Sequence, residues 1–188
     1  MSLANNKYNF IFVHIPKTAG TSMEQVPFMG ESYNKHAPIM FYRAMENLAN
    51  LEIDNYFKWC FVRDPYTRFI SGMLSHVINT ELKGLNDNQI RNKITEFVLK
   101  GEFGGEVLRP QHEFVEVEGK NVMDFLGRFE NINEDWSNVC KRIGVQPVDL
   151  PHKMKGNYTN YDYYYTPETR AIISKHYKKD FKMFGYKI

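Results

Sequence analysis

The chain has 188 residues, of which 43% are hydrophobic and 24% charged, and its formal net charge is +2. This composition excludes an intrinsically disordered chain, and the small net charge excludes a protein that grips nucleic acid by long-range attraction alone. A chain of this length buries roughly 70% of the surface that its unfolded form exposes, so its core needs no disulfide. We therefore expect one globular domain over residues 1–188 and no nucleic-acid partner.

The two cysteines have neither the spacing of a zinc site nor the number of a disulfide scaffold. Cys60 lies in an apolar run of strand length and Cys140 on the apolar face of a predicted helix. Both are expected to be buried free thiols, which fits a reducing cytoplasm, and no metal site is predicted. No apolar stretch reaches the length that crosses a bilayer, so we expect no membrane span.

The first predicted element is an apolar strand over residues 9–14, which leads into the loop Pro16–Ser22 and a helix start. A strand followed by such a loop builds an anion site, because the first N–H groups of the helix have no partner within it. Lys17 adds a positive charge, and Gly20 lets a phosphate or sulfate approach the backbone closely. The remaining loop residues offer hydroxyl and backbone donors: Thr18, Ala19, Thr21 and Ser22. The loop therefore predicts binding of a phosphate-like group.

This loop is not a Walker motif. A P-loop has two glycines ahead of its lysine in the order Gly-x-x-x-x-Gly-Lys-Ser/Thr. Here Lys17 comes first, Gly20 follows three residues later, and Pro16 precedes the lysine. The order argues against a magnesium-dependent ATP site of the P-loop kinase type.

Next along the chain, apolar residues at three- and four-residue spacing predict a helix over residues 37–51. A second strand is predicted over residues 56–62, and Arg63 follows it directly. Asp64 can cap a helix whose first turn holds Pro65. Ser71 then lies about two turns into that helix.

The second half of the chain predicts further helices and strands. Asp87 can cap a helix, residues 101–105 break the pattern, and residues 112–126 suggest a strand, a Glu-Gly turn and a further strand entering the sheet. Asn133 can cap a helix that Gly144 stops, and a last helix runs from Thr166 to about Lys178. Alternating strands and helices predict an α/β fold with a parallel sheet covered on both faces and ligands at the carboxyl ends of its strands.

The order Pro-Lys-Thr-Ala-Gly-Thr-Ser over residues 16–22 resembles the 5′-phosphosulfate loop of the sulfotransferases. It is most similar to the branch that contains the carbohydrate (heparan 2-O type) enzymes and their small bacterial relatives. In this family an arginine eight residues before a serine holds the 3′-phosphate of the donor, and Arg63 and Ser71 match both positions. The resemblance covers residues 1–80 well and the remainder only by the order of elements.

The resemblance implies a three-layer, P-loop NTPase-like sulfotransferase fold. It also implies 3′-phosphoadenosine 5′-phosphosulfate as the donor and no metal. The donor would be held by Lys17, Thr18, Ala19, Gly20, Thr21, Ser22, Arg63 and Ser71.

Sulfuryl transfer needs charge stabilisation on the departing phosphate and a base for the acceptor hydroxyl. Lys17 is expected to stabilise the leaving group. His36 is expected to be the base, because a histidine between the two donor motifs, just before a helix, plays that part in the resembling 2-O-sulfotransferases. His14, which ends the first strand, stays open as the rival base. His112 could contact the acceptor or is an exposed histidine, and His76 faces solvent or packs.

Three later features have a structural and a functional interpretation. The segment 151–157 holds Lys153, Lys155 and Gly156 and could cover the nucleotide, or it is a basic surface loop. The tyrosines over residues 158–165 could stack on a base or sugar, or they cover the core. The lysines over residues 175–182 form a solvated helix face or dock an acidic glycan.

The sequence thus predicts an enzyme that moves a sulfuryl group to a hydroxyl acceptor, either a carbohydrate or a small metabolite. Two alternatives stay open: a P-loop-type kinase and a catalytically idle nucleotide-binding module. Neither the acceptor nor the oligomeric state follows from the sequence.

Overall fold

The computed structural model describes residues 4–30, 35–49, 52–151 and 160–188. The chain forms two compact units. We call residues 1–63 with 111–153 the sheet unit, and residues 64–110 with 154–188 the helical unit. One domain over the whole chain stays a prediction.

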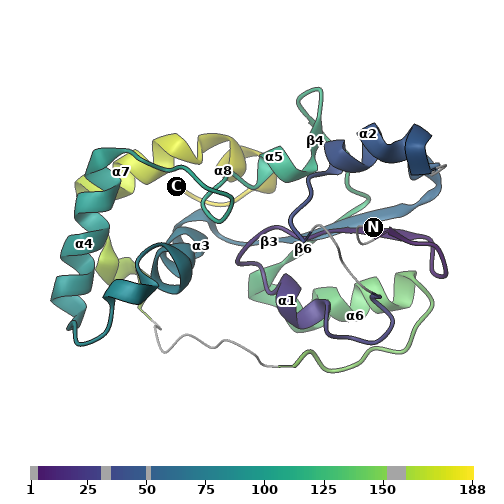
Figure 1. Ribbon diagram of the computed structural model, residues 1–188, viewed down its shortest axis with the longest axis horizontal. Helices are drawn as coiled ribbons and strands as arrows, with labels where there is room; N and C mark the ends of the chain where they lie inside the picture. Colours follow the sequence, from purple (N-terminus) through teal and green to yellow (C-terminus); the bar gives the residue numbers. More distant parts are fainter. Residues whose placement is uncertain (1–3, 31–34, 50–51, 152–159) are drawn as a thin grey trace. The chain divides into compact units, whose positions relative to one another are not determined.

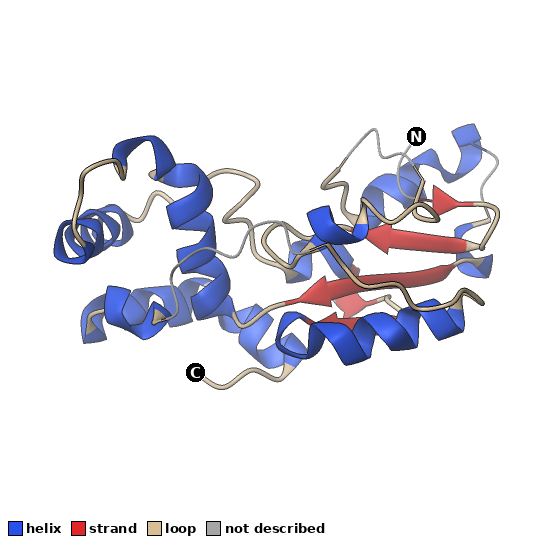
Figure 2. Ribbon diagram, turned by 90° about the horizontal axis from the view of Figure 1, so that it is seen from below, coloured by secondary structure: helices blue, strands red, loops and turns tan. Residues whose placement is uncertain are grey.

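The sheet unit is built on a four-stranded sheet in the order β1-β2-β3-β6. Its strands are β1 (Ala4–Asn5), β2 (Phe10–Val13), β3 (Phe57–Val62) and β6 (Phe125–Arg128). β2, β3 and β6 run parallel, while the short β1 pairs antiparallel with β2 (Figure 2). The predicted α/β fold with a mostly parallel sheet is confirmed, and β1 adds a strand that the sequence pattern does not predict.

Both faces of the central strands are buried, which explains why β2 and β3 read as continuous apolar runs. In Figure 1, α2 (Ile39–Ala49) lies on one side of the sheet, and α1 (Gly20–Met23) and α6 (Ile132–Arg142) lie on the other. On the α6 side, Trp59 of β3 stacks on Phe12 of β2 with ring centroids 4.3 Å apart. Aromatic packing therefore joins the two strands that lead to the predicted anion loops.

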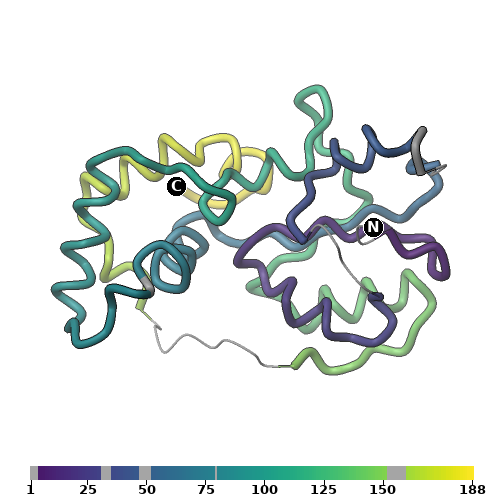
Figure 3. The backbone as a smooth tube through the Cα atoms, viewed as in Figure 1, coloured from purple at the N-terminus to yellow at the C-terminus, as the bar shows by residue number. Residues whose placement is uncertain are grey.

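The segment 112–126 differs from its prediction. Its first part is the short helix α5 (His112–Val115), and the Glu-Gly turn joins β4 (Glu116–Val117) to β5 (Lys120–Asn121). These two strands pair only with each other, and the hairpin stands out as the green loop at the top of Figure 3. The Glu-Gly turn is confirmed, but only β6 enters the main sheet, because Phe114 and Val115 bury their side chains from a helical turn instead.

Several helix ends differ from prediction by one to three residues. α2 begins at Ile39, and its expected end at residue 51 lies outside the described residues. α6 begins at Ile132 after Asn131, so Asn133 is not its cap, while its predicted inward residues Trp136, Val139, Cys140 and Ile143 are all buried. The apolar spacing locates a helix better than the capping residue does, because several neighbouring polar residues can cap.

In the described residues the helical unit has no strand. Its elements are α3 (Pro65–Gly72), a π-helix (Met73–Val77), a 3-10 turn (Asn79–Glu81), α4 (Asp87–Lys100), a 3-10 turn (Tyr161–Tyr164), α7 (Pro167–His176) and α8 (Lys178–Phe184). Asp64 caps α3 through Thr67 N–H at 2.9 Å, as predicted. The cap of α4 is Asn86 and not Asp87, because Asn86 and Gln89 form a reciprocal capping box. The predicted last helix ends at His176, and a second helix follows it.

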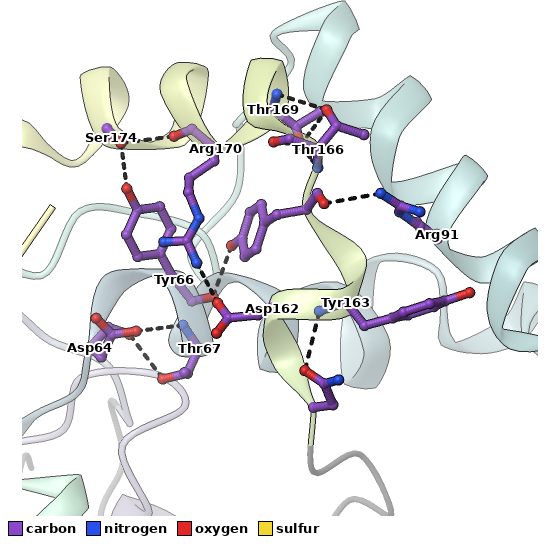
Figure 4. A network of polar contacts seen from close by, with 12 residues as sticks. Asp64, Tyr66, Thr67, Arg91, Asp162, Tyr163, Thr166, Thr169, Arg170 and Ser174 are labelled. Carbon is purple, nitrogen blue, oxygen red and sulfur yellow. Dashed lines mark hydrogen bonds and ion pairs between the residues drawn. The ribbon is translucent and has the colours of Figure 1, made fainter.

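Polar contacts and rings join three helical elements of this unit (Figure 4). Tyr66 of α3 and Ser174 of α7 share a hydrogen bond of 2.5 Å. The Arg170 guanidinium lies 4.2 Å from the centre of the Tyr66 ring and pairs with Asp162. Tyr165 donates to the Tyr66 carbonyl at 2.9 Å. These contacts hold α7 and the 160–165 turn onto α3, so the described part of the tyrosine cluster covers the core.

Candidate donor and catalytic site

The loop after β2 has a strained backbone. Lys17 and Ala19 both lie in the left-handed region, with φ of 69° and 71°, which non-glycine residues rarely adopt. Thr18 between them is fully buried, and its hydroxyl donates to the Ile15 carbonyl at 2.8 Å. Strain of this kind persists only where the surroundings impose it, and it clusters at ligand sites.

The first turn of α1 includes two N–H groups that make no backbone hydrogen bond with the described residues. Within the described residues, the N–H groups of Gly20 and Thr21 donate no backbone hydrogen bond, whereas Ser22 N–H already bonds the Ala19 carbonyl at 2.9 Å. Such groups are available to an anion. The predicted donor residues of this loop therefore sit together at the carboxyl end of β2.

Gly20 is required by packing as well. A Cβ atom at this position would lie 2.1 Å from Cδ2 and 2.3 Å from Nε2 of His14, far inside contact distance. The His14 ring therefore lies directly against the backbone that starts α1. A side chain at Gly20 would displace either the ring or the loop.

His14 is buried and pairs with an acid. Its Nδ1 donates to Oε1 of Glu24 at 2.7 Å, and its side chain is only 2% exposed. Burial lowers the pKa of His14, although the bond to Glu24 acts to raise it. Burial also acts to raise the pKa of Glu24, but the bond from His14 and the charge of Lys35 outweigh it, so this pKa is lowered. At neutral pH the pair is thus a neutral imidazole and a carboxylate.

Glu24 also ties the next segment to the loop. Its second oxygen lies 3.3 Å from Nζ of Lys35, and the same ammonium donates to the Thr21 hydroxyl at 3.0 Å. His36 Nδ1 lies 3.0 Å from the backbone carbonyl oxygen of His14, and the two imidazole rings meet edge to face with centroids 4.4 Å apart. A carbonyl oxygen only accepts, so Nδ1 of His36 carries the proton and Nε2 carries the lone pair.

Arg63, which follows β3 directly, contacts the loop after β2. Its Nη1 donates to the Lys17 carbonyl at 3.4 Å, and its guanidinium lies 4.1 Å from the centre of the Phe129 ring. The fully buried Gln111 accepts from Arg63 N–H at 2.9 Å and donates to the Arg63 carbonyl at 2.8 Å. The structure therefore brings Arg63 to the Lys17 loop, and the side-chain amide of Gln111 bonds both the N–H and the carbonyl of Arg63.

A model of the sulfotransferase family matches residues 2–187. The chain belongs to the sulfotransferase family. A protein of Archaeoglobus fulgidus named "Uncharacterized protein" is 29% identical over 97 residues, which cover 52% of this chain and 74% of that protein. No solved structure matches the chain. Family membership supports a transferase that moves sulfuryl groups, and it does not select the heparan 2-O branch.

Two further parts of the predicted sulfotransferase site are Ser71 and the segment 151–157. Ser71 is half-buried in α3 of the helical unit, where its carbonyl accepts from the Ser75 hydroxyl at 2.5 Å. Its role beside Arg63 stays a prediction. The predicted nucleotide-covering lysines and Gly156 lie outside the described residues, which resume at Asn160.

The sequence analysis missed three contributors to the site: Glu24, Gln111 and Phe129. Glu24 could have been suspected, since it follows Gly20 by one helical turn and so lies over the strand end. Gln111 is separated from Arg63 by 48 residues, and no local pattern pairs them. Phe129 follows β6, whose place beside β3 only the fold reveals.

The cysteines, metal binding and membrane spans complete the description of this sulfotransferase. Both cysteines are buried and free, and burial strongly raises the pKa of the Cys60 thiol, which keeps it protonated. In the described ranges, no group of three histidine, cysteine or acidic side chains could hold a metal ion. No described helix is both long and apolar enough to cross a bilayer. A cytoplasmic location stays a prediction.

Proposed function

We propose that this chain transfers a sulfuryl group from 3′-phosphoadenosine 5′-phosphosulfate to a hydroxyl of a carbohydrate or small metabolite. Family membership supports sulfuryl transfer in general. The observation that carries the proposal is the meeting of two motifs at one sheet edge, where Arg63 Nη1 lies 3.4 Å from the Lys17 carbonyl oxygen. We further propose the three-layer, P-loop NTPase-like arrangement of the carbohydrate (heparan 2-O type) branch.

The residues fit the two ends of this donor. The strained loop at Lys17 and Ala19, with the N–H groups of Gly20 and Thr21, suits the 5′-phosphosulfate. Thr18 and Ser22 complete that loop. Arg63 suits the 3′-phosphate, because a guanidinium supported by a ring and a fixed backbone can bind a phosphate with two donors. Ser71 joins it in our proposal on the strength of the sequence match.

In the proposed reaction, the acceptor oxygen attacks sulfur while the bond from sulfur to the 5′-phosphate oxygen breaks. The hydroxyl proton passes to Nε2 of His36, and Lys17 neutralises the charge that develops on the departing phosphate. The products are a sulfate ester and 3′,5′-adenosine bisphosphate. His36 is preferred to His14 as the base, because the ring of His14 is buried between Glu24 and Gly20 and is closed to an acceptor.

The test measures transfer of labelled sulfate from the donor to a panel of sugars and small alcohols. His36→Ala should abolish turnover and leave the affinity for 3′,5′-adenosine bisphosphate nearly unchanged. Melting temperatures should rise with the bisphosphate more than with ATP or 5′-AMP, since a ligand stabilises the state it binds. Magnesium-dependent use of ATP would instead show a kinase, and tight bisphosphate binding without turnover on any acceptor would show an idle module.

A further inference from the structure

No step of the proposed reaction uses Glu24, yet its carboxylate contacts two parts of the proposed site, His14 and Lys35. One oxygen accepts from His14 and the other pairs with Lys35, so the residue that caps the end of α1 contacts both the end of β2 and the segment that carries His36. The carboxylate is only 14% exposed. Keeping a charge in this position costs free energy unless the charge is paired, and here it has two partners.

The contacts run from Glu24 to His36 through one residue. Glu24 and the Gly20 backbone hold the His14 ring from two sides. The His14 ring in turn lies 4.4 Å from the His36 ring, and the His14 carbonyl takes the proton on His36 Nδ1. Both contacts that orient the His36 imidazole therefore come from His14.

From this arrangement we propose that Glu24 is a positioning residue, which holds His14 as a fixed support and thereby keeps Nε2 of His36 presented to the acceptor. The inference rests on the proposed role of His36 as the base. Glu24 itself touches neither donor nor acceptor in this proposal. Its contribution is geometric, and a base displaced by about 1 Å can lose about 100-fold in rate.

The two variants Glu24→Ala and Glu24→Gln separate this role from charge. The alanine variant removes the acceptor for His14 Nδ1–H, so kcat should fall about 10- to 100-fold, whereas the affinity for 3′,5′-adenosine bisphosphate should change less than about threefold. The glutamine variant keeps an amide oxygen that accepts the same bond, so it should restore most of kcat although the negative charge is gone. Glu134→Ala, on an exposed part of α6, is the matched control.

The second measurement does not depend on turnover. Nitrogen-15 shifts of the imidazole rings report which ring nitrogen carries the proton. In the unmodified chain and in Glu24→Gln, His14 and His36 should both be protonated on Nδ1, and in Glu24→Ala both should become mixtures of the two tautomers.

The outcomes keep the two proposals apart. Unchanged His36 shifts and unchanged kcat in Glu24→Ala overturn the positioning role and leave sulfuryl transfer standing. Equal loss of kcat in both Glu24 variants also overturns it, because charge and not the bond to His14 would then matter. No turnover in the unmodified chain, with the His36 shifts still responding to Glu24→Ala, overturns the proposed function and leaves the structural coupling intact.

Discussion

The sheet unit and the helical unit use their buried polar residues differently. In the helical unit these residues serve the backbone of the fold: Thr169 completes the cap of α7, and Arg68 donates to the carbonyls of Val107 and Arg109. In the sheet unit, two of them instead support residues of the proposed site: the His14 carbonyl accepts from His36, and Gln111 bonds the backbone of Arg63. A buried polar residue can therefore serve either the fold alone or the residues of a proposed site.

This comparison predicts that substitutions of the polar residues around the Lys17 loop in the sheet unit reduce donor binding and turnover, whereas substitutions in the Tyr66 network of the helical unit reduce stability alone. After His36→Ala, which should abolish turnover, the largest effect is expected at Lys17. Lys17→Met should lower kcat by about 100- to 1,000-fold, because it removes the charge proposed to stabilise the leaving phosphate. Steady-state transfer of labelled sulfate measures it, with Lys141→Met on the exposed end of α6 as control. A change of kcat no larger than that of the control would contradict the proposed role of the loop.

Gln111→Leu should affect both stability and binding. It removes the amide that bonds both the N–H and the carbonyl of Arg63, at a cost of about 1–3 kcal/mol for each of these groups that is left unsatisfied. Urea denaturation should show the lost stability, and calorimetry should show weaker binding of 3′,5′-adenosine bisphosphate. Gln146→Leu, which is exposed, should change neither. Unaltered bisphosphate affinity in a destabilised Gln111→Leu protein would mean that Arg63 needs no such support.

Tyr66→Phe tests the helical unit. It removes the hydroxyl that bonds Ser174 and keeps the ring beneath Arg170, so the free energy of unfolding should fall by about 0.5–1.5 kcal/mol. Thermal melting should show a decrease of a few degrees, and kcat should change less than about twofold. A large fall in kcat at full stability would break the division between the two units.

The smallest effect concerns pH. Because burial lowers the pKa of His14 in the folded chain, the unfolded chain binds the proton more tightly. Stability is therefore complete above the ordinary histidine pKa of about 6.5 and declines as the pH falls from there through the lower folded pKa. Urea denaturation between pH 8 and pH 5 should show a steeper decline for the unmodified chain than for His14→Gln. Parallel curves would show that His14 does not titrate in this range.

Local patterns located most elements and both loops. The run from Phe10 predicted β2, the Asp64-Pro65 pair predicted the start of α3, and the spacing of Trp136 and Val139 predicted the buried face of α6. These features depend on residues that are close together in the sequence, so the sequence alone predicts them. The prediction for residues 112–126 was wrong in part, since a short apolar run can be buried from a helical turn as well as from a strand.

The sequence by itself determined the mostly parallel α/β character, the loop at Lys17 after β2 and the placement of Arg63 at a strand end. Only the tertiary structure decided that Gln111 holds Arg63, that Gly20 makes room for the His14 ring, and that Glu24 reaches both His14 and Lys35. The physical reason is the distance along the chain over which each interaction acts. Propensity, capping and apolar spacing act over one or two turns of chain, whereas these contacts depend on which strand ends and loops the folded sheet brings together.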